Sequence, residues 1–280
     1  MSSPMAIMTN SAALNAQRNL MSTGRNMNTS IERLSSGLKI NSASDDAAGI
    51  AVSTGLEAQT RGFQQAMENA NEAIALLQTA EGSYNSVSDI LIRMRELAVQ
   101  SASDTLTTKE RAYLNTEFED LTAEITRISD VAEYNGISLL TGTAGDGSGN
   151  MVFQVGTRNT GNDRIEIELK DQDSASLNVE TLDLTDLLNS QTAITTIDTA
   201  LDLLATDRAT LGSKINELTA SVDNLSVTIE NLSAANSQIK DADIAAESAD
   251  FTKHQVLMQS GVAMLSQANG VSQMALRLIG

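Results

Sequence analysis

The sequence contains no cysteine and no tryptophan, and it has one histidine and one proline among 280 residues. Without cysteine the chain has no disulfide, no thiol nucleophile and no thiolate metal ligand. One histidine, His254, cannot supply the paired histidines of a zinc peptidase, and no nucleophile elbow accompanies it. The proline, Pro4, precedes every predicted helix and interrupts none. We therefore expect a mainly α-helical protein that is not an enzyme and needs no cofactor or metal.

Long apolar runs and excess basic charge are also missing. No segment approaches the run of about 20 apolar residues that spans a membrane, so we expect no membrane insertion. The first ten residues lack the basic and apolar regions of a cleavable signal peptide, so an exported chain would use a route that reads no such signal. A net charge of −18 argues against nucleic acid as a partner, because its phosphates would be repelled.

The negative charge is concentrated in the middle of the chain. Residues 1–44 carry four basic residues and one acidic residue, and residues 236–280 carry three basic and four acidic residues. A mildly basic arm beside an acidic body fits packing between copies, with the acidic part facing water. Disorder of the first arm in the isolated monomer is the alternative.

What the sequence does contain is a repeated four-three spacing of apolar residues, the heptad pattern of packed helices. It occurs in residues 20–38, in 114–128, and most clearly in 211–239, where Asn236 is a candidate polar position that fixes the register. Residues 244–280 continue apolar. A long helix is expected from about Ala47 to Ser101. Its predicted seam is Phe63, Met67, Ala70, Ile74, Leu77, Tyr84 and Leu91, with Glu81 and Ser88 as polar exceptions.

The centre of the chain has a different character. Glycines cluster between residues 131 and 175, and two alternating segments, Met151–Val155 and Arg164–Lys170, flank the turn at Asn159–Asn162. This pattern predicts a β-hairpin. The long helix on one side of the hairpin would be roughly 80 Å long at 1.5 Å per residue, too long for a globular core.

These elements are nested, because the two arms mirror each other across the hairpin. The predicted fold class is mainly α: an elongated helical bundle or coiled coil with discontinuous domains and a small central β-hairpin. We expect residues 1–44 with 236–280 to form a terminal coiled-coil assembly domain, and residues 45–235 to form a helical rod with the hairpin near 150–170.

The apolar stripes of the two arms are unfinished without partners, which favours a self-assembling structural subunit. Methionines concentrate in these arms, and methionine suits both core packing and permissive interfaces. The predicted subunit-interface residues are Leu20, Met27, Ile31, Leu34, Leu38, Phe251, Leu257, Met264, Leu265, Met274 and Leu278.

Paired carboxylates precede two of the helices. Asp45 with Asp46, and Asp241 with Asp243, do not match the twelve-residue spacing of a calcium-binding EF-hand loop. We interpret them as caps and charges at helix N-termini.

The arms also carry long motifs that resemble the signatures of bacterial flagellins. The resemblance covers about residues 1–142 and 205–280, and 143–204 corresponds only to the variable centre. The matching segments are Ser30–Gly49, Leu91–Ser101, Tyr134–Gly136 and Leu139–Gly142 in the first half, and Asp241–Glu247 and Gln267–Asn269 in the second.

The resemblance implies a subunit of the extracellular flagellar filament used for swimming. The terminal arms would form an inner tube and the middle helices a surrounding layer, with no room for large outer domains. Export would pass through the flagellar type III apparatus, and the resemblance also implies an export chaperone and a filament cap as partners.

By the same resemblance, Arg93, Leu97 and Glu117 match positions through which an animal Toll-like receptor senses the monomer. Independently, Arg93 and Leu97 are four residues apart and share a helix face. Packing against a neighbouring subunit is the alternative native role of that face.

Three other functions remain open at this point. A hook–filament junction protein would share the arms, and copy number would distinguish it. A coiled-coil adhesin or scaffold would keep a fixed stoichiometry and would not grow from seeds. An enzyme grafted into residues 143–204 is disfavoured because that stretch has no histidine or cysteine.

Overall fold

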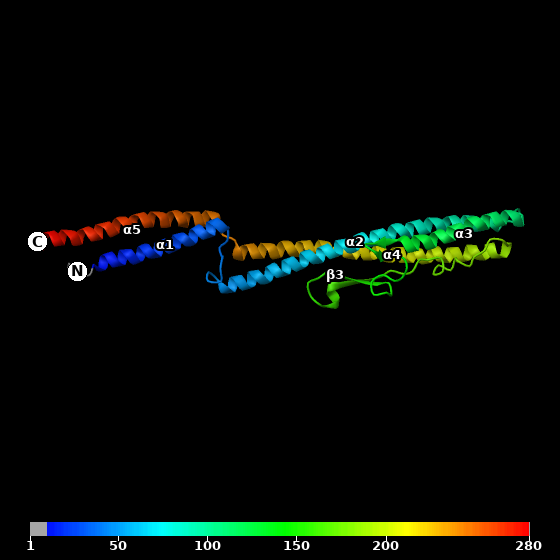
Figure 1. Ribbon diagram of the computed structural model, residues 1–280, viewed down its shortest axis with the longest axis horizontal. Helices are drawn as coiled ribbons and strands as arrows, with labels where there is room; N and C mark the ends of the chain where they lie inside the picture. Colours follow the sequence, from blue (N-terminus) through cyan, green and yellow to red (C-terminus); the bar gives the residue numbers. More distant parts are fainter. Residues whose placement is uncertain (1–9, 280) are drawn as a thin grey trace. The chain divides into compact units, whose positions relative to one another are not determined.

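The computed structural model describes residues 10–279, with side chains as far as Gly270. Helices dominate, and the only strands in this range form two short antiparallel pairs, so the mainly α fold class is confirmed (Figure 1). The helices are α1 (Ser11–Ser36), α2 (Ala47–Ser101), α3 (Thr108–Val131), α4 (Leu187–Lys240) and α5 (Ile244–Ile279). The strands are β1 (Glu133–Tyr134), β2 (Ile137–Ser138), β3 (Asn150–Gln154) and β4 (Arg164–Glu168).

The chain divides into two units. The terminal unit contains residues 1–58 and 231–280, and the central unit contains residues 59–230. The terminal unit is therefore discontinuous in sequence, and the boundaries between the units fall inside α2 and α4.

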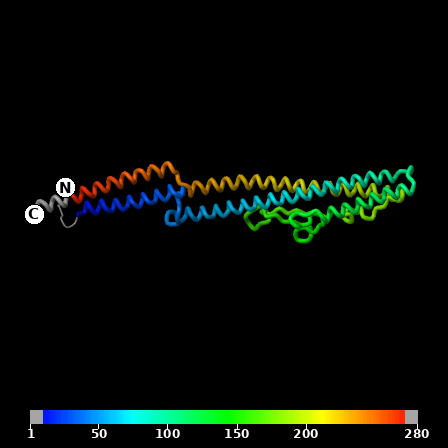
Figure 2. The backbone as a smooth tube through the Cα atoms, turned by 45° about the horizontal axis from the view of Figure 1, so that its top comes forward, coloured from blue at the N-terminus to red at the C-terminus, as the bar shows by residue number. Residues whose placement is uncertain are grey.

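In the central unit, parts of α2 and α4 lie beside α3 (Figures 1 and 2). The buried stripe of α2 contains both small and large residues, and Ala80 and Val87 are buried at the places where the predicted seam had the polar residues Glu81 and Ser88. That seam was therefore wrong in detail, because alanines carry little hydrophobic signal in a sequence although they let helices approach closely. The stripe keeps strict four-three spacing: Ala66, Ala70, Ala73, Leu77, Ala80, Tyr84, Val87, Leu91, Met94 and Ala98.

Helix α4 begins well before the seam found in the sequence. Ala193, Ile197, Ala200 and Leu204 are buried and extend the heptad pattern from Leu211 toward the N-terminus. The next seam position after Leu204 is occupied by Asp207, a carboxylate only 6% exposed, which hides the repeat in the sequence.

Asp207 fastens the segment after the hairpin to the helices. Its two oxygens accept hydrogen bonds from Lys170 Nζ and Gln172 Nε2, both at 2.8 Å. Burial, and then the nearby Asp207 charge, raise the pKa of Tyr84 to about 12. The hairpin itself has the predicted alternation, with Ile165 and Ile167 buried between exposed neighbours.

The helix ends agree with the carboxylate caps inferred from the sequence. Asp46 Oδ1 accepts the backbone N–H groups of Ala48 and Gly49 at the start of α2, and Asp243 Oδ1 accepts those of Ala245 and Ala246 at the start of α5. At the end of α1, Gly37 adopts the left-handed conformation (φ 72°) that closes a helix.

Candidate assembly surfaces

The terminal unit is built from an antiparallel pair of helices, α1 and α5 (Figures 1 and 2). Gly261 lets the two helices approach closely, whereas a side chain at Gly24 would make only an ordinary van der Waals contact. A β-carbon on Gly261 would lie 2.7 Å from Leu20 Cδ1, and one on Gly24 would lie 3.7 Å from Met258 Cε. Apart from Gly270, the partly buried residues of α5 with described side chains fall on one heptad seam facing α1: Glu247, Phe251, His254, Met258, Gly261, Leu265 and Ala268.

Polar contacts fix the register of this pair from end to end. Asn10 Nδ2 donates to the carbonyl oxygen of Ala268 (3.0 Å), and Arg33 forms an ion pair with Glu247 (3.6 Å). At the other end, the N–H of Lys39 donates to the carbonyl of Lys240 (2.7 Å). In each of these pairs the two residue numbers add up to nearly the same value, as expected when two segments run antiparallel without a shift in register.

The terminal unit also includes the first part of α2, as far as residue 58, and the last part of α4, from residue 231. There Ser53 Oγ, on a residue only 4% exposed, donates to Asn236 Oδ1 at 2.6 Å. The polar seam position noted in the sequence therefore makes a specific side-chain contact within the terminal unit.

The terminal unit has almost no hydrophobic core of its own. Of its residues with described side chains, Ile40 is the one buried hydrophobic residue, whereas the central unit contains an extended buried cluster. Large apolar side chains of the two arms are exposed to water instead: Leu14, Met21, Ile31, Ile244, Val256, Leu257, Val262 and Met264. Exposed apolar residues in this number on two paired helices are typical of an interaction surface.

The predicted interface residues separate into two groups. Ile31 (46% exposed), Leu257 (47%) and Met264 (67%) are open to solvent and available to a partner. The side chains of Met274 and Leu278 lie outside the described residues. The others are half-buried in the structure, most of them between α1 and α5: Leu20, Met27, Leu34, Leu38, Phe251 and Leu265.

Several exposed apolar residues of the arms were not predicted from the sequence as interface residues. Leu14 and Met21 were not assigned to an interface, although they are seven residues apart on α1. Val262 and Ile244 were missed on α5. Leu14 and Met21 could have been found from a second seven-residue spacing of apolar residues on α1, displaced from the spacing of the residues that face α5.

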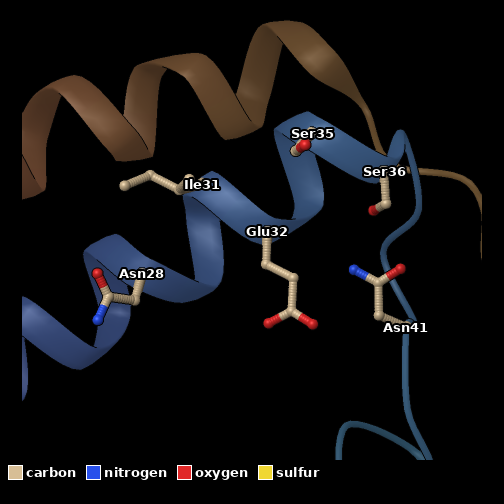
Figure 3. A pocket seen from close by; sticks show the side chains of 6 residues that line it. All are labelled: Asn28, Ile31, Glu32, Ser35, Ser36 and Asn41. Carbon is tan, nitrogen blue, oxygen red and sulfur yellow. The ribbon is translucent and has the colours of Figure 1, made fainter.

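Two grooves run along the arms. The first lies between the helices, where Ala16, Leu20 and Gly261 lie between the exposed Leu257 and Met264. The second surrounds Ile31 on α1 (Figure 3). There Glu32 projects away from α5, on the side where Asn41 lies.

In the central unit, Arg93 and Glu117 join α2 to α3 on the surface. Arg93 donates to Glu117 Oε1 from Nε (2.9 Å) and from Nη2 (2.7 Å), and also to Glu96. The hydrogen bond to Glu117 and then that to Glu96 raise the pKa of Arg93 further above its usual value. Leu97 is not on this surface, since it is only 1% exposed and belongs to the core.

His254 lies on the α5 seam, and its Nδ1 is buried with no hydrogen-bond partner. Within the described residues no group of three or more histidine, aspartate or glutamate side chains is arranged to hold a metal ion. In the same part of the chain no helix has the length and apolar character needed to cross a membrane.

Comparisons with known proteins identify what these surfaces resemble. Residues 7–145 match the bacterial flagellin N-terminal helical region, and residues 194–279 match the C-terminal helical region. The chain is 42% identical to a flagellin of Halalkalibacterium halodurans, over 98% of this chain and 100% of that protein. It is 39% identical to the flagellar filament 33 kDa core protein of Treponema phagedenis, with the same coverage. The crystal structure of Bacillus cereus flagellin is similar with a TM-score of 0.50 and 33% identity, over 56% of this chain and 88% of that one.

Proposed function

Because this chain belongs to the bacterial flagellins, we propose that its α1–α5 pair is the surface through which copies join into a filament. The family is one of structural filament proteins, not enzymes, and the chain is a subunit of the flagellar filament used in motility. One observation carries the assignment of the surface. The arms pair with each other yet leave large apolar residues exposed, and the terminal unit buries almost no core.

The two parts of the chain would then have separate roles. Residues 1–44 and 236–280 form the inner tube, where the exposed stripes of neighbouring copies complete one another. Residues 45–235 form the surrounding layer, which suits their excess of negative charge. A buried core in the central unit supports this division, because that unit can fold before assembly.

Seeded growth tests the proposal. Monomer is diluted onto sheared filament seeds and elongation is followed by electron microscopy. The full chain is expected to elongate the seeds, and a chain without residues 1–44 is expected not to. Circular dichroism serves as the control, since α2 starts at Ala47 and the shortened chain should keep the thermal transition of its central unit. Elongation by the shortened chain at the wild-type rate would exclude the arm as the joining surface.

Export in an unfolded state through the flagellar type III apparatus, with a chaperone on the terminal arms and a cap at the growing tip, completes the proposal. Support comes from the family and from the apolar surface of the arms, which a chaperone would have to cover before assembly. A secreted pool that disappears when the export apparatus is inactivated is the expected result. Secretion that continues without the apparatus would contradict it.

A Toll-like receptor would read the monomer at Arg93 and Glu117, with Leu97 supporting that surface from below. The exposed ion pair supports this proposal for the two charged residues, and the burial of Leu97 limits it to a packing role. Receptor reporter cells should respond less to Arg93→Ala than to wild type. The matched control is Arg95→Ala, whose side chain is similarly exposed and pairs with Asp198. Equal responses to all three chains would refute the proposal.

A further inference from the structure

The buried seam of α4 contains one charged residue within the described part of the chain, Asp207. It is 6% exposed and lies at a four-three position among apolar neighbours. A carboxylate is costly in such a place unless hydrogen-bond donors replace the water that it loses. The apolar neighbours on the seam are Ala193, Ile197, Ala200, Leu204 and Leu211.

The donors for Asp207 come from one irregular segment. Residues 169–186 follow β4, precede α4 and contain no helix or strand; we call them the strap. Lys170 Nζ donates to Asp207 Oδ1 and Gln172 Nε2 donates to Asp207 Oδ2, each at 2.8 Å. Both carboxylate oxygens are thus satisfied by the strap.

The strap is itself held in place against the helices of the central unit. The backbone N–H of Gln172 donates to the carbonyl of Leu140 (2.8 Å). The N–H of Leu184 donates to Asn115 Oδ1 in α3 (2.8 Å), and Ser101 Oγ in α2 donates to the carbonyl of Leu184 (2.7 Å). The two donors for Asp207 are therefore available at one place, beside α2 and α3 of the same chain.

Without Asp207, the α4 seam would suit pairing with a copy of itself. Alanine, isoleucine and leucine at four-three spacing pack against one another in coiled coils between chains. In such a pair Asp207 would be buried away from Lys170 and Gln172. In a parallel pair in register, the two Asp207 carboxylates would also face each other. Removing the partners of a buried charge is strongly destabilising, so Asp207 disfavours pairing between α4 helices.

The other buried polar residue of α4 in the described range, Ser190, does not have this selectivity. Its Oγ can donate to the carbonyl of Asp186, four residues earlier in the same chain (2.8 Å). A hydroxyl that is satisfied by its own turn of chain tolerates any packing partner. The charge of Asp207 has no such local donor, and its partners lie more than 30 residues away in sequence.

We propose that Asp207 determines what the α4 seam packs against: the helices and strap of its own chain, and not the α4 helix of a second copy. Asp207 is thus a specificity residue that keeps the central units of separate copies from associating through their cores. This inference goes beyond the proposed function, because it concerns central-unit residues alone and does not depend on the arms.

A cysteine reporter on the seam tests the proposal, because the chain has no cysteine of its own. Leu204 is 1% exposed, so the thiol of Leu204→Cys is shielded in the folded monomer and becomes available to a second thiol when two seams meet. The full chain with this reporter is refolded from urea by dilution, treated with oxidised glutathione and analysed on a non-reducing gel. Adding Asp207→Leu should raise the yield of linked pairs roughly tenfold or more. The reason is that an unsatisfied buried charge costs more than the ~1.4 kcal/mol that changes an equilibrium tenfold.

Two matched variants exclude simpler explanations. Asp202→Leu makes the same substitution at an exposed position of α4 and should leave the yield at the level of the reporter alone. Gln172→Leu removes one donor but keeps the charge on the seam, so it should lower the midpoint of urea unfolding without raising the yield. Equal yields from Gln172→Leu and Asp207→Leu would overturn the proposal, because a loosened strap would then be sufficient for pairing.

Asp207→Asn is a second variant, since it removes the charge with nearly the same shape and should keep the circular dichroism of wild type. Its yield of linked pairs should lie between those of the reporter alone and Asp207→Leu. Yields at the level of the reporter alone for both Asp207 variants would overturn the proposal. Failure of the wild-type chain to elongate seeds would instead contradict the proposed function and leave this inference standing, because the cross-link requires no filament.

Discussion

Met264→Ala is expected to weaken assembly while leaving the folding of the monomer intact. In the monomer the Met264 side chain is 67% exposed, so its truncation should change the free energy of unfolding by less than about 0.5 kcal/mol. Full burial of a methionine side chain contributes roughly 1.5–3 kcal/mol, and about two-thirds of that remains to be gained on assembly. The variant should therefore lose about 1–2 kcal/mol per subunit in the filament, and its critical concentration should rise roughly 5- to 30-fold.

The critical concentration can be measured by sedimenting filaments after seeded growth and assaying the protein left in solution. Met264→Leu is the matched control, because it keeps the volume and the apolar character and should stay close to wild type. A melting temperature equal to that of wild type would show that the monomer is intact. An unchanged critical concentration for Met264→Ala would refute the reasoning, because the side chain would then remain exposed in the filament.

Three further predictions concern the central unit and the chemistry of the arms. Asp207→Ala leaves the buried amide of Gln172 without its acceptor, so urea unfolding should show a loss of about 1–3 kcal/mol, and a smaller loss for Asp207→Asn; no loss would contradict the role of this contact. Backbone and side-chain hydrogen bonds from Thr107 lower the pKa of Glu110 in the folded state, so its stabilising effect should be present above the ordinary value of 4.5 and disappear as the pH falls through the lower folded value. Denaturation at several pH values should show that dependence in wild type and not in Glu110→Gln. Mild peroxide treatment of the monomer should convert Met264 to the sulfoxide and slow seeded growth, whereas the same treatment of Met264→Leu should slow growth less; equal slowing would place the sensitive methionine elsewhere.

The long helices could be predicted because their signals are local. The bounds expected for α2, about Ala47 to Ser101, agree with the structure, and the alternation around Ile165 and Ile167 was enough to locate the hairpin. Caps at Asp46 and Asp243 followed from residue type and position alone.

Other features depend on packing between distant segments and were less visible. Helix α4 reaches back to Leu187, and within it the buried Asp207 is satisfied by Lys170 and Gln172, two residues from another part of the chain. A buried aspartate without visible partners interrupts the pattern in the sequence, although its hydrogen bonds make it acceptable in the core.

The division of the arms into paired and open residues was also not predictable from spacing. Leu20 and Met264 both looked like interface residues, yet Leu20 packs against Gly261 within the monomer and Met264 does not pack closely. The predicted interface set combined two heptad phases, and only the pairing of α1 with α5 distinguishes them.

Amide hydrogen exchange in the monomer and in the filament tests the central claim most directly. That claim is that the α1–α5 pair is completed only by other copies. Amides of residues 11–36 and 244–270 should exchange quickly in the monomer and become strongly protected in the filament, because two helices with almost no buried core open readily. Amides of the buried parts of α2, α3 and α4 should be protected in both states. Arms that are already as protected in the monomer as the central unit, with no change on assembly, would contradict the account.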